Sequence, residues 1–371
     1  MRVLFFATFF EYRGAETYYT LEVNSLIKNY PEVEFLVYTV NRDKNRLKKY
    51  SENVLWVERK NLKNIKSFFL FLKDMVKIFT KFKPDIVHSV YVIESIITGI
   101  IAKIFRVPSI FHSRGMDFNY YPFISLKSNF LARVACKLNN IILTVSKSMK
   151  NDSLRLNVPP NKVIHIYDGV DFSKFNPFGK KFDSMDRTFQ ILHIGRFSHE
   201  KRHDLIIEAC KKLREDNFNF HLTFIGIGEL KNQIATLIKN YDLEDYIELT
   251  GWVDHEKLPS YILKMDLFIL PSITEGLPIS VVEAMSMGLC VVLTNVGGMP
   301  ELAQQIGGIL VEKNNVEQLY DAIIYYLKNP QDLELGGKIN REFIINNFNW
   351  DLHSKKLYTI YLKLINNKKF N

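Results

Sequence analysis

The stretch 271–301 constrains the fold of this chain more than any other part of the sequence. An apolar run, Leu267–Leu270, comes directly before it and predicts a buried strand. Pro278 suits the first turn of a helix, where its missing N–H costs nothing, and Gly288 suits the end of that helix. A second apolar run, 289–293, predicts the next strand. The order strand, loop, helix, strand is typical of a parallel sheet, which binds ligands at the carboxyl ends of its strands.

Two glutamates stand out in this stretch, Glu275 in the predicted loop and Glu283 eight positions later in the predicted helix 279–287. The N-terminus of a helix presents free N–H groups and partial positive charge, which attract phosphate. Carboxylates accept hydrogen bonds from hydroxyl groups such as those of sugars. The combination predicts a ligand that contains both phosphate and sugar. The alternative is a pair of solvated surface glutamates, and the longer pattern E-G-L-P-x-x-x-x-E-A-M argues against it.

A second motif follows the predicted strand 189–194. It reads G-R-F-S-H-E-K and places Arg196 and Lys201 in the loop after that strand. Arg196 offers a planar fork of N–H donors, and Lys201 offers a compact positive charge. These two cations form a pair that can hold a diphosphate and neutralise its charge.

Both motifs resemble those of the retaining glycosyltransferases of family 4, E-x7-E and G-R-x-S-x-E-K, and the resemblance spans nearly the whole chain. It implies an α/β structure of the GT-B type, with two Rossmann-like domains whose parallel sheets face an interdomain cleft. It also implies an enzyme that moves a sugar from a nucleotide-diphosphate donor, UDP- or GDP-linked, to a hydroxyl acceptor with retention of configuration. No cofactor is predicted. Because the sequence contains no D-x-D, we expect the reaction to need no metal ion.

The resemblance further implies roles for individual residues. In this family the first glutamate contacts the donor sugar and the second binds the ribose, which assigns these roles to Glu275 and Glu283. Arg196 and Lys201 stabilise the departing diphosphate, together with helix amides at the start of 279–287. The neighbouring residues expected in the donor site are Gly276, Leu277, Ser280 and Val281.

Three positions outside these motifs join the predicted site. Gly14 follows the first predicted strand, where a glycine lets backbone approach a phosphate, although Arg13 stands where the family usually has another glycine. His112 stands at the carboxyl end of a predicted strand and matches a family histidine that contacts the donor sugar, so we expect it to face the cleft and act in catalysis. A structural histidine is the alternative. Val253 lies in a loop that meets the nucleobase in the family.

The predicted organisation of the chain has two domains. Residues 1–170 form an acceptor-side domain, to which a C-terminal helix, 350–371, returns. Residues 171–187 combine proline, glycine and mixed charge and are expected to be a linker. Residues 188–349 form the domain that binds the nucleotide sugar. With 371 residues and 47% hydrophobic content, the chain is long enough for two such cores.

Cysteine usage and apolar patterning indicate a cytoplasmic protein. The three cysteines lie in apolar or helical stretches without the spacing of a metal site, which favours a reducing compartment. No apolar run reaches the length of a membrane span. The apolar start, 1–10, lacks a small-residue cleavage site, so we expect a first strand and not a secretory signal.

The net charge of +9 is unevenly distributed. Residues 1–180 hold 28 Lys and Arg against 15 Asp and Glu, a balance of +13, and residues 181–371 hold 21 against 25, a balance of −4. A basic first half favours contact with the anionic inner face of the cell membrane, through the lysine-rich helix 60–83 and the aromatic loop 118–123. The acceptor would then be a glycan or lipid-linked sugar of the cell envelope. Ordinary solvation of lysines in a Lys/Asn-rich sequence explains the charge equally well.

Three other functions compete with glycosyl transfer. A nucleotide-sugar epimerase or hydrolase of the same fold would use the same donor site without an acceptor. A nucleic-acid-binding protein would explain the positive charge, but the sequence lacks a recognised aromatic–basic module, so no nucleic-acid partner is predicted. A zinc site is suggested by H-E-x-x-H at 199–203, but His199 falls in a loop ahead of the predicted helix 204–213, so we expect no metal there.

Overall fold

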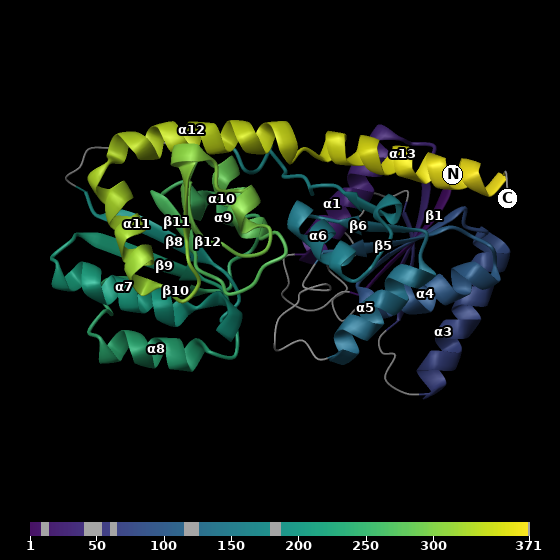
Figure 1. Cartoon of the computed structure of the whole chain (residues 1–371), viewed down its shortest axis with the longest axis horizontal. Helices are drawn as coiled ribbons and strands as arrows, with labels where there is room; N and C mark the ends of the chain where they lie inside the picture. The colour runs from purple at the N-terminus through teal and green to yellow at the C-terminus, as the bar shows by residue number, and fades with distance from the viewer. Residues whose placement is uncertain (9–14, 41–53, 60–64, 115–125, 179–186, 370–371) are drawn as a thin grey trace. The chain divides into compact units, whose positions relative to one another are not determined.

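The computed structural model describes the chain except for residues 9–14, 41–53, 60–64, 115–125, 179–186 and 370–371. The chain divides into two compact units (Figure 1). The first contains Met1–Gly169 and Asn349–Asn371, and the second contains Val170–Phe348. The described residues of the expected linker, 171–187, belong to the second unit.

A seven-stranded parallel sheet forms the centre of the first unit, with the order β3-β2-β1-β4-β5-β6-β7. Its central strands are buried along their length, because helices cover both faces of a parallel sheet. The strand order reverses between β1 and β4, and doubly wound sheets bind ligands at such a switch point. The strands are β1 Arg2–Thr8, β2 Glu34–Val40, β3 Val54–Arg59, β4 Ile86–Val90, β5 Ser109–Ser113, β6 Ile141–Thr144 and β7 Val163–His165.

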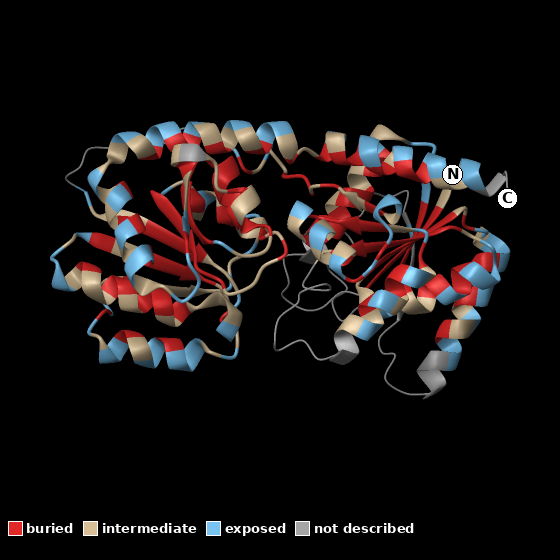
Figure 2. Cartoon of the chain, in the orientation of Figure 1, coloured by how far each residue is buried: buried red, intermediate tan, exposed pale blue. Residues whose placement is uncertain are grey.

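The helices of the first unit make one core on each face of the sheet (Figure 2). One core joins the sheet to α1 and α13, and it fully buries Leu26, Leu357 and Tyr361. The other core joins the sheet to α3 and α4 around Phe71. The helices are α1 Ala15–Asn29, α3 Ile65–Lys77, α4 Val92–Ile104, α5 Leu126–Leu138, α6 Lys147–Arg155 and α13 Trp350–Lys369.

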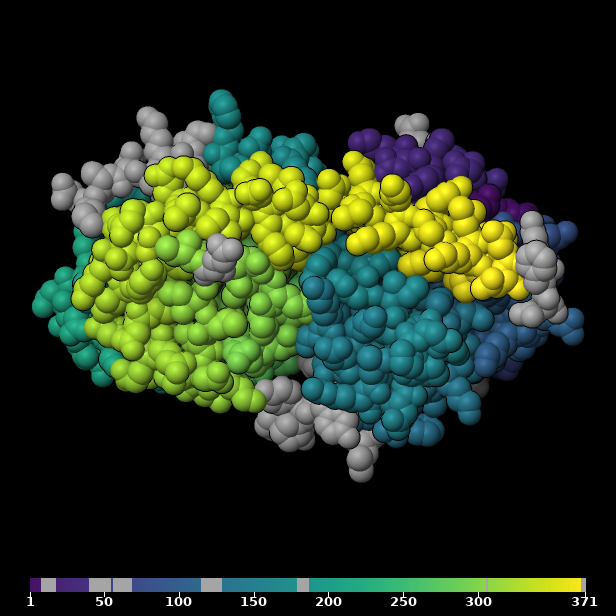
Figure 3. Space-filling view, turned by 45° about the horizontal axis from the view of Figure 1, so that its top comes forward, coloured from purple at the N-terminus to yellow at the C-terminus, as the bar shows by residue number. Residues whose placement is uncertain are grey.

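Helix α13 belongs to the first unit although the whole second unit precedes it in the sequence. The hydroxyl oxygens of Ser25 and Ser354 lie 2.6 Å apart, and the rings of Tyr30 and Tyr358 stack with their centroids 3.9 Å apart. Figure 3 shows α13 in yellow alongside α1 in purple. The first unit therefore has two chain segments, distant in sequence, on one face of its sheet.

The helix predicted over 60–83 changes geometry before its end. Helix α3 ends at Lys77 and a five-residue π-helical turn, Ile78–Phe82, follows it. Pro84 explains the termination, because a proline disfavours helical geometry in the residue before it. Lys83, the residue before Pro84, leaves right-handed helical geometry and has a φ of +50°. The start of the prediction, 60–64, lies outside the described residues.

A six-stranded parallel sheet forms the centre of the second unit, with the order β10-β9-β8-β11-β12-β13. This order reverses between β8 and β11, and the two sequence motifs follow those two strands. The strands are β8 Phe189–Ile194, β9 Phe220–Ile225, β10 Ile247–Gly251, β11 Leu267–Leu270, β12 Cys290–Thr294 and β13 Gly308–Val311. The helices are α7 His203–Glu215, α8 Lys231–Asn240, α9 Leu258–Ile262, α10 Ile279–Ser286, α11 Val316–Lys328 and α12 Pro330–Asn347.

Among the helices of the described residues, none combines the length and the apolar content that crossing a bilayer requires.

Candidate active site

The two motifs of the second unit meet at the carboxyl edge of its sheet. Strands β8 and β11 pair side by side, so the loops that follow them are neighbours. The amide of Ile273 donates to the carbonyl oxygen of Glu200 at 2.9 Å, and the hydroxyl of Ser280 donates to the carbonyl oxygen of Ile194 at 3.1 Å. The start of α10 is thereby tied to the end of β8.

Lys201 and Glu275 form an ion pair across these loops. The Lys201 ammonium donates a hydrogen bond to Glu275 Oε1, although 74 positions separate the two residues. Their side chains are 17% and 13% exposed, so water screens the pair incompletely. The residue predicted to bind phosphate and the residue predicted to accept hydrogen bonds from sugar hydroxyls therefore lie next to each other.

The loop that carries Glu275 is fixed by the loop after β12. Gly297 has a φ of +54°, and a Cβ atom there would lie 1.8 Å from the carbonyl oxygen of Glu275, so only glycine fits. The amide of Gly298 donates to the carbonyl oxygen of Gly276 at 2.9 Å, and the hydroxyl of Thr294 donates to the carbonyl oxygen of Ser272. These hydrogen bonds fix the backbone on both sides of Glu275.

Arg196 belongs to a different ion pair. Its guanidinium donates to Glu229 Oε2 at 2.9 Å, and both side chains are about half exposed. Close backbone approach between the loops after β8 and β9 brings these residues together, with the amide of Leu230 donating to the carbonyl oxygen of Phe197 at 3.0 Å. Both predicted diphosphate ligands are therefore neutralised by carboxylates in this structure.

The remaining predicted donor residues of this segment lie in the first turn of α10 and in the loop just before it. Gly276 is buried, whereas Leu277 and Ser280 are partly exposed beside the start of the helix. The amide of Val281, which is expected to face the diphosphate, donates to the carbonyl oxygen of Pro278 at 3.2 Å. One of the predicted phosphate-binding amides is therefore hydrogen-bonded within the protein. Val253 is partly exposed in the loop after β10, and Gly14 lies outside the described residues.

Glu283 is not the solvated helix residue of the alternative interpretation. Its side chain is 3% exposed and accepts a hydrogen bond from His255 Nε2 at 2.6 Å. Burial alone lowers the pKa of His255, but the hydrogen bond and the charge of Glu283 outweigh it and raise that pKa above 6.5. Sequence reasoning missed His255, which lies two positions after Val253 in the loop expected to meet the base.

His112 lies near the end of β5 as predicted, and its side chain is fully buried in the first unit. The reason is strand alternation, because His112 shares a sheet face with Ile110, which belongs to the core under α1 and α13. Its Nδ1 lies 3.1 Å from His88 Nε2, and His88 Nδ1 lies 2.6 Å from the hydroxyl of Tyr361. A catalytic role for His112 remains a prediction.

Charged residues surround these histidines inside the first unit. Arg114 donates to Glu22 Oε2 and lies 3.1 Å from Asp168 Oδ1, and all three side chains are buried. His353 of α13 donates from Nδ1 to the carbonyl oxygen of Tyr167 at 2.8 Å, because a carbonyl can only accept. This network joins α1, the end of β5 and α13 in one buried ionic cluster.

Glu22, His88 and His112 have the residue types of a metal site, and their ligand atoms lie within 4.8 Å of one another. Arg114 already neutralises Glu22, and the facing nitrogens of His88 and His112 are hydrogen-bonded to each other. We therefore interpret this group as an ionic network. In the H-E-x-x-H match, His199 lies in a 3-10 turn and is exposed, whereas His203 begins α7 and is buried against aromatic rings. The zinc motif instead requires both histidines on one face of a single helix.

Acid should destabilise this network. Burial lowers the pKa of His88 to about 3 and that of His112 to about 4, against 6.5 in the unfolded chain. Between pH 6.5 and 4 the unfolded chain binds more protons, so the free energy of unfolding should fall by about 1.4 kcal/mol per pH unit for each histidine. Urea unfolding at pH 7 and pH 5 measures this loss. A His112→Asn variant with the same pH dependence as the wild type would contradict the assignment.

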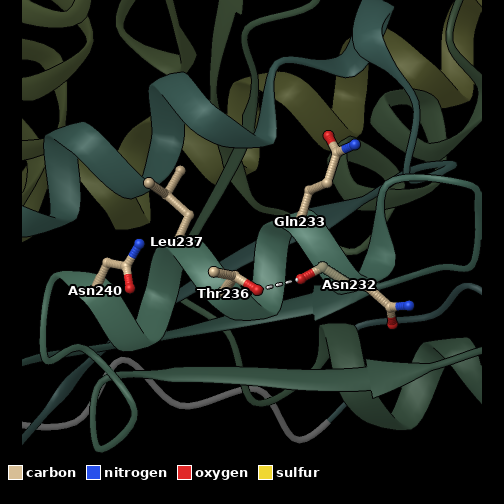
Figure 4. A pocket seen from close by; sticks show the side chains of 5 residues that line it. All are labelled: Asn232, Gln233, Thr236, Leu237 and Asn240. Carbon is tan, nitrogen blue, oxygen red and sulfur yellow. Dashed lines mark hydrogen bonds between the residues drawn. The ribbon is translucent and has the colours of Figure 1, made fainter.

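A hollow on the second unit offers no alternative site. It has a volume of about 340 Å³ and is lined by side chains of α8 alone (Figure 4). The hydroxyl of Thr236 donates to the carbonyl oxygen of Asn232 at 2.9 Å, which is ordinary helix bonding. Its lining residues, Asn232, Gln233, Thr236, Leu237 and Asn240, include no titratable group.

Two family models together match the chain from residue 12 to residue 347. The model described as Glycosyltransferase Family 4 matches residues 12–174, and the model described as Glycosyl transferases group 1 matches residues 176–347. The chain belongs to glycosyltransferase family 4. The family resemblance found in the two motifs is therefore confirmed.

Curated relatives of this family-4 chain include the amylovoran biosynthesis glycosyltransferase AmsK of Erwinia amylovora, 30% identical over 55% of this chain and 53% of AmsK. The UDP-Gal:alpha-D-GlcNAc-diphosphoundecaprenol alpha-1,3-galactosyltransferase of Escherichia coli is 28% identical over 83% of this chain and 81% of that protein. The chain spans about half the length of the first curated relatives that it matches.

The fold is shared with solved structures. Anabaena HepE, crystallised in complex with UDP and glucose, aligns with a TM-score of 0.81 and 17% identity over 98% of this chain and 100% of that chain. This likeness, together with the two parallel sheets, confirms the predicted α/β fold class of the GT-B type.

Proposed function

We propose that this chain transfers a sugar from a nucleoside-diphosphate donor to a hydroxyl acceptor, with retention of configuration and without a metal ion. The Lys201–Glu275 pair carries the proposal, because it joins a cation for phosphate to a carboxylate for sugar hydroxyls at the start of a helix. Family membership supports the same reaction type.

In the proposed reaction the acceptor hydroxyl attacks the anomeric carbon from the face that the diphosphate leaves. The bond from that carbon to the diphosphate oxygen breaks, and the hydroxyl proton passes to the departing oxygen. Arg196 and Lys201 stabilise the negative charge that develops on the departing diphosphate. Glu275 accepts hydrogen bonds from the donor sugar, and Glu283 accepts them from the ribose. The incoming diphosphate competes with Glu229 and Glu275 for the two cations, so binding should rearrange both ion pairs.

The names of two relatives support a more specific proposal. The galactosyltransferase is named for a UDP-linked donor and a diphosphoundecaprenol-linked sugar, and AmsK is named for amylovoran biosynthesis. We therefore assign this chain a UDP-linked sugar and a glycan or lipid-linked acceptor of the cell envelope. The reaction would take place in the cytoplasm, at the inner face of the membrane.

A donor panel tests this function. Thermal shift with UDP, GDP and their sugar conjugates should identify one donor, which adds about 2.7 kcal/mol of stability at a hundredfold excess over its dissociation constant. Donor turnover should then depend on added acceptor and continue in EDTA. Turnover without acceptor would indicate an epimerase or hydrolase, and loss of activity in EDTA that zinc or magnesium restores would contradict metal independence.

Attachment to an anionic membrane is part of the proposal. Helix α4 exposes Ile93, Ile100 and Ile104, which recur at helical spacing, and α3 exposes Leu70 and Val76. Exposed lysines accompany these apolar residues on both helices. Apolar and basic side chains on one unit suit an anionic bilayer surface. The loop predicted as a second contact, 118–123, lies outside the described residues.

Vesicle flotation tests the attachment. Each lysine near an anionic surface adds about 1 kcal/mol of binding, screened over about 8 Å at physiological salt. The protein should rise with anionic vesicles at low salt and be released at high salt, and an Ile100→Asp/Ile104→Asp variant should bind more weakly. Equal, negligible binding to anionic and neutral vesicles would exclude this surface as a membrane contact.

A further inference from the structure

His255 lies at the edge of the donor site that the motifs define, but no motif contains it. It stands in the loop between β10 and α9, two positions after Val253. Its side chain is 19% exposed, whereas that of Glu283 behind it is 3% exposed. His255 is therefore the more accessible member of the pair.

The contact between the two side chains is specific. His255 Nε2 donates to Glu283 Oε1 at 2.6 Å, a short distance that suits a hydrogen bond to a charged group. Glu283 needs such a partner, because the residues beside it on α10, Val282 and Ala284, are buried and a carboxylate buried among apolar groups is costly unless it is hydrogen-bonded. A bond to Oε1 also fixes the plane of the carboxylate and hence the direction of Oε2.

His255 is itself held from two sides. Its ring packs against the buried ring of Phe175, with the centroids 5.3 Å apart. The next residue, Glu256, accepts from the ammonium of Lys174 at 2.6 Å, which ties the loop to the same segment. Arg341 donates to the carbonyl oxygens of Phe175 and of Ser286, the last residue of α10. The support of His255 and the helix of Glu283 are therefore connected.

We propose that His255 is a positioning residue, which holds the Glu283 carboxylate in the orientation that accepts hydrogen bonds from the ribose of the nucleotide. This inference rests on the proposed function, since it assigns the ribose to Glu283. His255 acts through Glu283 and needs no contact with the reacting atoms. Its side chain adds a specificity element to the donor site that the E-x7-E motif does not contain.

The charge of His255 gives the inference a pH signature. Glu283, Lys174 and Glu256 are the charged groups that act on its ring, and together with burial they leave the pKa of His255 raised above 6.5. Protonated His255 donates the stronger hydrogen bond, because charge-assisted bonds are roughly twice as strong as neutral ones. The affinity for UDP should therefore fall about fivefold as pH rises through this pKa.

Calorimetric titration of the full chain with UDP tests the inference. His255→Ala should weaken UDP binding about tenfold or more and raise the donor KM, while kcat changes little. His255→Gln keeps a donor at the place of Nε2, so it should retain most of the affinity and lose the pH dependence. His221→Gln is the matched control. His221 lies near the amino end of β9, whereas the candidate donor site lies at the carboxyl ends of the strands of this sheet.

A double-mutant cycle separates positioning from general support. If His255 acts through Glu283, adding His255→Ala to Glu283→Ala should cause no further loss of UDP affinity. Unchanged or tighter UDP binding in His255→Ala, or a pH profile in His255→Gln like that of the wild type, would overturn the inference. Failure of the wild type to bind UDP or any other nucleoside diphosphate would refute the proposed function itself, and the two failures are therefore distinguishable.

Discussion

Replacing Lys201 by alanine should lower turnover by at least about a hundredfold while the protein stays folded. Its ammonium is the cation paired with Glu275, and it is partly shielded from water, so its charge acts strongly on a neighbouring diphosphate. The substitution removes stabilisation of the leaving group and also leaves Glu275 without this counter-charge. Arg196→Ala should have an effect of similar size, because it removes the second cation.

Steady-state turnover with circular dichroism as a check on folding measures this effect. Lys211→Ala is a suitable control, since Lys211 pairs only loosely with Glu215, at 3.7 Å on the exposed face of α7. The control should retain wild-type turnover. Near-normal turnover of both Lys201→Ala and Arg196→Ala would remove these residues from the mechanism.

Alanine variants of the two glutamates should affect UDP binding and sugar transfer differently. Glu283→Ala should weaken the binding of free UDP, because the ribose contact is lost. Glu275→Ala should leave UDP binding nearly intact and lower sugar transfer by about a hundredfold, because the contact proposed for Glu275 is with the donor sugar, which UDP lacks. The two carboxylates already differ in surroundings, with Glu283 bonded to His255 and Glu275 paired with Lys201.

Calorimetry with UDP and a transfer assay on the same preparations decide between these roles. Glu275→Gln keeps the shape of the side chain and shows whether the charge is needed for transfer. Equal losses of UDP affinity in the Glu275 and Glu283 variants would refute the division of roles.

The meeting of Lys201 with Glu275 could be predicted from the sequence because each follows a predicted parallel strand. Parallel strands end at the same edge of a sheet, so residues in their following loops converge whatever the separation in sequence. Apolar runs likewise predicted β8, β11 and β12 to within one residue. Such patterns could not predict the partner that each cation has in the ligand-free protein, such as Glu229 for Arg196.

His112 and His255 show where sequence reasoning ends. The alternation of side chains along a strand predicts which residues share a face of the sheet. It does not predict that α13, more than two hundred positions later, is one of the helices that cover the face of His112. The bond between His255 and Glu283 joins a loop to a helix 28 positions away, and no helical or strand period relates them. Both contacts depend on tertiary packing, which local patterns do not encode.

The place of α13 in the chain bears on how the protein is synthesised. Residues up to Gly169 leave the ribosome long before Trp350–Lys369, which supply Leu357 and Tyr361 to their core. The second unit is continuous from Val170 to Phe348 and can close as soon as it has emerged. The unit that is synthesised first is thus the later one to complete its core. A chain cut after Phe348 would contain the whole second unit, whereas the first unit would lack α13 and expose to chaperones the apolar residues that α13 covers.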